Sequence, residues 1–175
     1  DRHLLDLSIG ILPLSLNRWR LMVKVIDNFL SAKEHQILKY QLEEESFPWY
    51  FEPKSIPETT NNRAFHFNHN FYREENGGYV NSEFFHIIKP LISKLKVHTL
   101  VRVKANLKTI EEKLMEFDPH RDQYFDCKVA IYYVGTNNGY TKIGDQKVNS
   151  VKNRIALFNS NTVHYGTNCT DKQRR

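Results

Sequence analysis

Two histidines and an aspartate with the spacing of metal ligands lie in the second half of the chain. His120 and Asp122 are two residues apart, and His164 follows much later. Side chains two residues apart on an extended backbone leave the same face, so His120 and Asp122 can bind one ion together. Two histidines and one carboxylate form the facial triad of non-haem Fe(II) sites, which leaves the opposite octahedral face for a co-substrate and O₂. Arg174 and Arg175 follow His164 by about one strand's length, and an arginine in a dry pocket suits a dicarboxylate. The pattern predicts an iron site beside a dicarboxylate site.

Other residues of the chain are weaker candidates for a metal site than His120, Asp122 and His164. Asp118 is also two residues from His120, but Pro119 removes a donor and stiffens the approach, which favours Asp122 as the ligand and a turn or capping role for Asp118. His66 and His69 are three residues apart on an expected strand, so they point to opposite faces and serve packing or substrate contact. The sequence has no H-E-x-x-H motif, EF-hand loop or thiolate cluster. A cupin-type metal site would place another histidine where Asp122 stands.

Further polar and aromatic side chains are candidates for ligand binding. Only one of Arg174 and Arg175 can point into a barrel, because successive residues of a strand face opposite sides. Polar side chains on neighbouring strands could hydrogen-bond the co-substrate or simply line a barrel: Asn106, Tyr133 or Tyr132, and Thr141. The aromatic-rich region before residue 73 supplies the expected substrate contacts: Tyr50, Phe51, His69 and Tyr72.

The periodicity predicts a mainly β fold with flanking helices. Ser31 with Glu34 three residues later is typical of a helix start, and this helix is expected to end near Glu45. A second helix is expected over 82–96, where Pro90 must kink or restart it. Strands are expected over 21–27, 64–72, 99–108, 127–134, 140–143, 146–151, 154–158 and 162–165. Many short strands separated by polar turns favour a jelly-roll barrel or sandwich, with the helices backing one sheet.

Length and composition favour one folded domain. The 175 residues suit an N-terminal arm over 1–20 and a single domain over 21–175. The net charge of +5 is spread among acidic residues, so a nucleic-acid surface is a minority expectation. Two cysteines form no disulfide framework, and the apolar run 9–14 is too short to span a bilayer. These features favour a soluble, cytoplasmic protein, and nothing specifies its oligomeric state.

Several motifs together resemble one enzyme family. The relevant segments are 25–30, 102–107, 120–122, 133–134 with 137–141, 153–154 with Phe158, and His164 with Arg174. From residue 25 onward the chain resembles the 2-oxoglutarate/Fe(II)-dependent dioxygenase superfamily, in particular its small prolyl-hydroxylase-like members. The resemblance implies a double-stranded β-helix, or cupin-like jelly roll. It also implies iron ligands at His120, Asp122 and His164, and a co-substrate arginine at Arg174, ten residues after the distal histidine.

The chain departs from the family pattern in two places. Many relatives have Gly-Gly-Thr where this chain has Gly139-Tyr140-Thr141. The family continues with a further barrel strand after the position of Arg175, so the resemblance implies that this strand is missing here.

The resemblance implies an oxidoreductase that uses Fe(II), 2-oxoglutarate and O₂. Such an enzyme hydroxylates a peptidyl or small-molecule substrate and releases succinate and CO₂. Two alternatives remain open at this point. The net positive charge would suit a nucleic-acid demethylase of the same fold, and a barrel without catalytic activity could act as a binding module.

Overall fold

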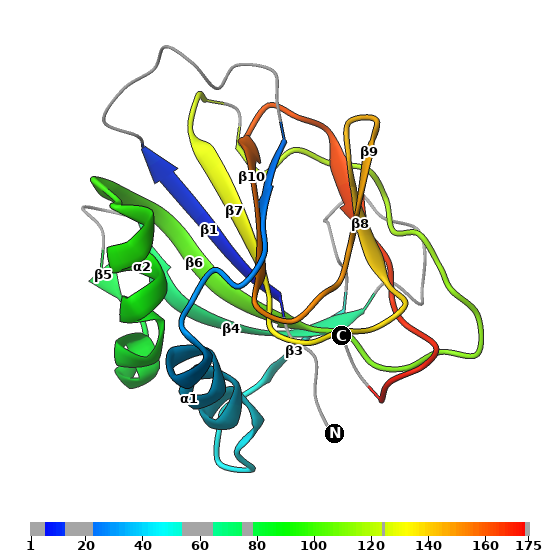
Figure 1. Cartoon of the computed structure of the whole chain (residues 1–175), viewed down its shortest axis with the longest axis horizontal. Helices are drawn as coiled ribbons and strands as arrows, with labels where there is room; N and C mark the ends of the chain where they lie inside the picture. Colours follow the sequence, from blue (N-terminus) through cyan, green and yellow to red (C-terminus); the bar gives the residue numbers. More distant parts are fainter. Residues whose placement is uncertain (1–5, 13–22, 54–64, 75–78, 124, 174–175) are drawn as a thin grey trace.

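The protein is mainly β, with its helices gathered on one side (Figure 1). The computed structural model describes residues 6–12, 23–53, 65–74, 79–123 and 125–173. Within these residues an eight-stranded and a three-stranded antiparallel sheet accompany two α-helices and a 3₁₀ helix. The prediction of a β-rich fold with flanking helices is therefore confirmed, although the described strands do not close into a barrel.

The large sheet carries most of the framework. Its strands run in the order β2-β10-β7-β1-β6-β4-β3, and β5 pairs with β4. The bounds of these strands are β1 Asp6–Leu12, β2 Lys24–Ile26, β3 Tyr50–Glu52, β4 His66–Arg73, β5 Tyr79–Val80, β6 Thr99–Leu107, β7 Lys128–Tyr133 and β10 Arg154–Asn159. The small sheet has the order β11-β8-β9, with β8 Tyr140–Ile143, β9 Gln146–Asn149 and β11 His164–Gly166.

The large sheet lies between two hydrophobic cores because its strands alternate their side chains. In β7, Ala130 and Tyr132 pack on the side of the helices, whereas Val129, Ile131 and Tyr133 pack toward the small sheet. The helix-side core includes residues of α1 (Ala32–Glu43), of the 3₁₀ helix η1 (Glu83–Ile88) and of α2 (Lys89–Leu95). The second core includes Ile143 of β8 and Val148 of β9. The result is three layers: helices, large sheet and small sheet.

Residues 6–12 were expected to belong to an N-terminal arm, but they form β1 in the middle of the large sheet. β1 pairs antiparallel with both β6 and β7. Leu7 and Ile9 are fully buried in the helix-side core. The segment therefore belongs to the framework that carries the site.

Both expected helix starts are present. Ser31 caps α1 with a capping box: its hydroxyl accepts from the Glu34 N–H at 3.3 Å, and the Glu34 carboxylate accepts from the Ser31 N–H at 2.9 Å. The helix ends at Glu43, slightly earlier than expected. Ser82 caps η1, and Pro90 lies in the first turn of α2, so the expected restart at this proline is confirmed.

Asn153 ties the start of α1 to the turn before β10. Its φ of 60° is left-handed, a conformation that asparagine tolerates better than most residues. Its amide accepts from the Leu30 N–H at 2.8 Å and donates to the Leu30 carbonyl at 2.9 Å. It also accepts from the buried Tyr132 hydroxyl at 2.9 Å. This one side chain links α1, β7 and β10.

The observed strands differ from the expected ones mainly at their ends. β2 is shorter than the expected strand over 21–27, and β11 begins later than the strand expected over 162–165. β3 and β5 were not predicted; they lie at the edge beside β4. None of the described helices is long and apolar enough to cross a membrane.

Candidate metal centre

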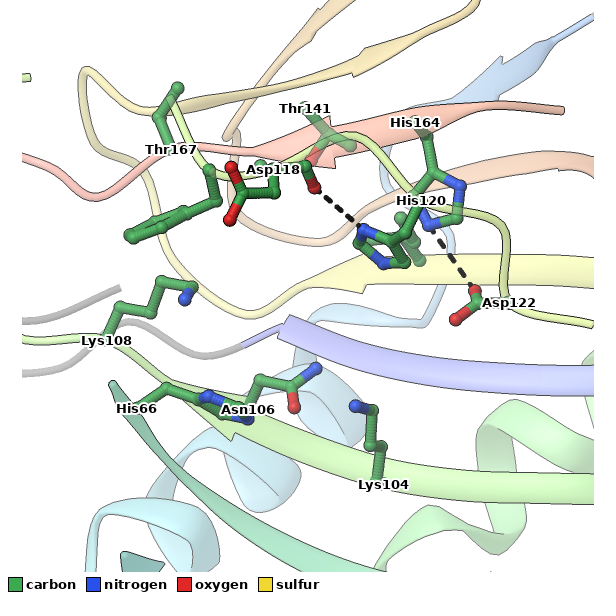
Figure 2. Close-up of a pocket in the computed structure, with 13 residues that line it drawn as sticks. His66, Lys104, Asn106, Lys108, Asp118, His120, Asp122, Thr141, His164 and Thr167 are labelled. Carbon is green, nitrogen blue, oxygen red and sulfur yellow. Dashed lines mark hydrogen bonds and ion pairs between the residues drawn. The ribbon is translucent and has the colours of Figure 1, made fainter. Parts of the chain in front are cut away.

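The structure brings His120, Asp122 and His164 together at one end of the small sheet (Figure 2). His164 begins β11 and forms an antiparallel bridge with His120, in which each backbone N–H donates to the other residue's carbonyl at 2.9 Å. This pairing sets the two imidazole rings side by side, with centroids 4.5 Å apart. One ligand atom from each of the three residues lies within 4.8 Å of the others. The backbone pairing therefore explains how two histidines distant in sequence meet.

Both histidine rings are oriented by backbone carbonyls. His120 Nδ1 lies 3.1 Å from the Asp118 carbonyl, and His164 Nδ1 lies 3.1 Å from the Thr162 carbonyl. A carbonyl can only accept, so each Nδ1 must carry a proton, and Nε2 is the nitrogen that each ring, when neutral, would offer to a metal. Metal-binding histidines typically have this second hydrogen bond.

The Asp122 carboxylate uses its two oxygens differently. Arg102 of β6 donates to Oδ1 at 2.8 Å, and Oδ2 faces His164 Nε2 at 3.5 Å. Burial alone would raise the pKa of Asp122. The hydrogen bond and charge of a protonated His164, together with the charges of Arg102 and Lys104, outweigh it and hold the pKa well below its usual range. Asp122 is therefore a carboxylate with one oxygen aimed at the histidines.

These three residues fit a divalent metal ion of the Fe(II) type. Two imidazole nitrogens and one carboxylate oxygen converge from one side, which is the donor set of the non-haem iron facial triad. Burial, and then the neighbouring His164, lower the pKa of His120, which favours the neutral imidazole that a metal requires. The Asp118 carboxylate is not part of this group, although Asp118 lines the same cavity.

A cavity of about 110 Å³ adjoins the triad. Its opposite wall comes from the large sheet: Lys104 and Asn106 of β6, Lys108 just after β6, and His66 of β4 (Figure 2). Lys104, Asn106 and Lys108 share one face because they alternate along an extended chain. Ile131 of β7 and Thr141 of β8 also contribute to the lining. The cavity thus has the His120, Asp122 and His164 side chains on one side and a basic, polar wall on the other.

The basic wall is strongly desolvated. Burial, and then the charge of Arg102, lower the pKa of Lys104 to about 8 despite the opposing effect of Asp122. Burial, and then the charges of Lys108 and Lys104, lower the pKa of His66 to about 3. The Lys108 ammonium lies 3.5 Å from the centre of the Phe117 ring, a cation–π contact. His66 is therefore neutral at pH 7, whereas Lys104 remains largely charged.

The residues expected to bind the co-substrate have different locations. Asn106 and Thr141 line the cavity. Tyr133 is fully buried in the core between the two sheets, outside the cavity lining. Tyr132 faces the helices instead, where its hydroxyl contacts Asn153 and His35. Arg174 and Arg175 lie outside the described residues.

The expected substrate residues do not line this cavity. His69 faces the helices, where its ring nitrogens lie 2.8 Å from the Pro48 carbonyl and 2.7 Å from the Ser82 hydroxyl. Tyr72 packs beside Phe85 on the same side of the sheet. Tyr50 and Phe51 lie on the edge strand β3 and are largely exposed. His69 therefore packs on the helix side of the sheet, and none of the four side chains lines the cavity beside the triad.

Sequence reasoning assigned no role in the site to Arg102, Lys104 or Lys108, and left His66 to packing or substrate contact. The signal was present, because polar side chains at 102, 104 and 106 alternate with apolar ones along the strand. Alternation identifies a shared face but does not say what that face meets.

Searches of protein-family models, of curated proteins and of solved structures find no match to this chain.

Proposed function

We propose that the protein is an Fe(II)- and 2-oxoglutarate-dependent oxygenase with a double-stranded β-helix fold. The observation that carries the proposal is the convergence of His120, Asp122 and His164, with both histidine Nδ1 atoms held by backbone carbonyls. The layered arrangement, in which a small sheet packs on a larger one, is compatible with a jelly roll. The motifs that resemble the dioxygenase superfamily favour this activity over other uses of the same donor set.

Different residues of the chain would bind the metal and the co-substrate. His120 Nε2, His164 Nε2 and Asp122 Oδ2 would hold the iron, and Arg102 would keep the Asp122 carboxylate in place. Asn106 and Thr141 would hydrogen-bond the co-substrate within the cavity. When bound, the iron supplies O₂ activation coupled to decarboxylation of 2-oxoglutarate to succinate and CO₂. The desolvated wall would exclude water from this chemistry.

The substrate is proposed to be a small molecule or a peptidyl side chain that reaches the open side of the cavity. The four aromatic and histidine positions first expected to contact it are not retained in this proposal, since none of them lines the cavity beside the triad. The resemblance also implies that Arg174 binds 2-oxoglutarate.

An anaerobic titration tests the proposal. Fe(II) and then 2-oxoglutarate are added to the protein while the visible charge-transfer band of the chelated complex is recorded. We expect a band that requires both additions, that disappears in His120→Ala, and that persists in His86→Ala, which alters an exposed histidine. Metal binding without any band would reject the oxygenase and leave a metal-binding module as the function of the site.

A further inference from the structure

A second pocket lies at the edge of the large sheet, where residues of β3, of β4 and of the start of η1 meet. Its volume is about 330 Å³, against about 110 Å³ for the cavity beside the triad. Within the described part of the chain the two hollows share no lining residue. The lining of this edge pocket includes three hydrogen-bonded residues: Ser82, His69 and Pro48. The proposed oxygenase makes no use of them.

These three residues have the arrangement of a serine nucleophile and its base. His69 Nδ1 lies 2.8 Å from the Pro48 carbonyl, and His69 Nε2 lies 2.7 Å from the Ser82 hydroxyl. Because a carbonyl only accepts, Nδ1 carries a proton. In the neutral ring Nε2 is therefore the acceptor, and the Ser82 hydroxyl donates to it. Serine nucleophiles are activated by such an imidazole, whose other nitrogen is held by a third group.

The surroundings keep the imidazole in place and neutral. His69 is only 3% exposed, and its ring centroid lies 4.5 Å from that of Phe47 and 4.7 Å from that of Phe71. Burial lowers the pKa of His69 and outweighs the opposing effect of the hydrogen bond with Pro48, so the ring is neutral at pH 7. That hydrogen bond favours the charged ring, which helps the imidazole when it takes a proton. His69 is thus a fixed proton acceptor beside Ser82.

The Ser82 oxygen lies among groups that can stabilise negative charge. Ser82 is partly exposed at the pocket wall, and its oxygen accepts from the Phe84 N–H at 3.0 Å. This N–H would stabilise the oxygen as its proton leaves. Asn81 lines the same pocket, and its side-chain amide is of the type that donates to the oxyanion of a tetrahedral intermediate.

The remaining lining favours a neutral substrate. Among the described residues that line the edge pocket, Glu83 is the only one with a formal charge, so an anionic substrate would meet repulsion and no cation. Tyr50 and Phe84 supply aromatic surface for an acyl group.

We propose that Ser82 and His69 form a second catalytic site, which hydrolyses neutral carboxylic esters. The Ser82 oxygen bonds to the ester carbonyl carbon while its proton passes to His69 Nε2. The tetrahedral intermediate expels the alcohol, which takes that proton, and an acyl-Ser82 remains. Water then adds to the acyl carbon and gives a proton to Nε2. The carboxylic acid leaves as the proton returns to Ser82, so an ester and water become an acid and an alcohol. No step uses the triad.

Hydrolysis of p-nitrophenyl acetate tests the site. We expect the wild-type protein to release p-nitrophenolate, and Ser82→Ala and His69→Gln each to slow this release by ~100-fold or more. The matched controls alter an exposed serine and an exposed histidine: Ser46→Ala and His86→Gln should keep the wild-type rate. His120→Ala should also keep it, because the two sites are separate. Folded Ser82→Ala protein with the wild-type rate would overturn the proposal.

Covalent labelling gives a second measurement that does not require Ser82→Ala to fold. Diisopropyl fluorophosphate bonds to the oxygen of an activated serine and loses fluoride. Intact-protein mass and peptide mapping should show one adduct, on Ser82, and His69→Gln should prevent it although Ser82 is still present. A hydroxyl that only caps η1 and satisfies His69 would remain unlabelled. The absence of an adduct on Ser82 in the wild-type protein therefore rejects the catalytic site.

Discussion

The ion pair between Arg102 and Asp122 should stabilise the protein even without metal. Arg102→Met removes the guanidinium that donates to Asp122 Oδ1 at 2.8 Å. The Asp122 side chain is 11% exposed, so its carboxylate would remain desolvated and lose its shortest hydrogen bond. We therefore expect a substantial loss of unfolding free energy in the apo-protein.

The size of this loss follows from the burial of the two partners. Removing one partner of a fully buried ion pair costs about 3–5 kcal/mol. Arg102 is 27% exposed, and His164 and Lys104 would remain near the carboxylate, which reduces the cost. A loss of about 2 kcal/mol is expected on this basis, which corresponds to a fall in Tm of roughly 4–8 °C for a chain of this length.

The control is the other arginine–aspartate pair, between Arg154 and Asp27. Its Nε–Oδ1 distance is 2.6 Å, but the Asp27 side chain is 55% exposed, so solvent screens the pair. Arg154→Met should cost no more than about 1 kcal/mol. Urea unfolding of both variants, without metal and at neutral pH, provides the comparison. If Arg102→Met destabilises the protein no more than Arg154→Met does, the Arg102–Asp122 contact is not a stabilising part of the site.

Three further predictions concern the framework and the buried histidine. Leu7→Ala should cost about 2–5 kcal/mol in urea unfolding because Leu7 is fully buried in β1; a cost typical of a surface residue would contradict the placement of β1. Asn153→Ala should cost about 3 kcal/mol because it leaves buried groups unsatisfied and places alanine at a left-handed φ. Asn153→Gly, which tolerates that φ, should recover part of the loss in the same assay. The pKa of His66 is about 3 in the folded protein and about 6.5 in the unfolded chain. Protonation therefore favours the unfolded chain, and the unfolding free energy falls as the pH drops from 6.5 toward 3. His66→Gln should therefore flatten the decline in unfolding free energy between pH 6.5 and 4, whereas His86→Gln should leave it unchanged.

Local sequence signals predicted the helix starts and several central strands well. The capping box at Ser31 depends on residues three apart, and the strand ending near Val134 is a continuous apolar run. β1 was missed although Leu7, Ile9 and Ile11 alternate with Ser8 and Gly10. A short alternating segment gains its stability from the strands on either side, and sequence alone does not reveal that β6 and β7 flank it.

The grouping of His120, Asp122 and His164 could be predicted because their residue types and spacing are specific, whereas the opposite wall of the cavity could not. The sequence of β4 separates Phe67 and Phe71 from His66 and Asn68, and the structure keeps this alternation. The sequence does not reveal which face of β4 lies opposite the triad. That depends on the third layer, where the backbone bridge between His120 and His164 brings distant segments together. His69 lies on the phenylalanine side and therefore packs against the helices.

The cavity wall opposite the triad buries charged and polar groups, unlike the other face of the same sheet, which buries apolar side chains. On its other face, β6 buries Val103, Ala105 and Leu107 in the helix-side core. On the cavity face, the same strand holds Lys104 in a desolvated position beside unsatisfied atoms of Asn106 and His66. Each of these groups lowers the stability of the unliganded protein, and apolar residues of similar size would pack there without that cost. Local departures from the folding rules are expected where a site is built for a ligand. Since a ligand that carries both hydrogen-bond acceptors and a donor would satisfy all three groups at once, the same feature that weakens the free protein would make it more stable when such a ligand is bound.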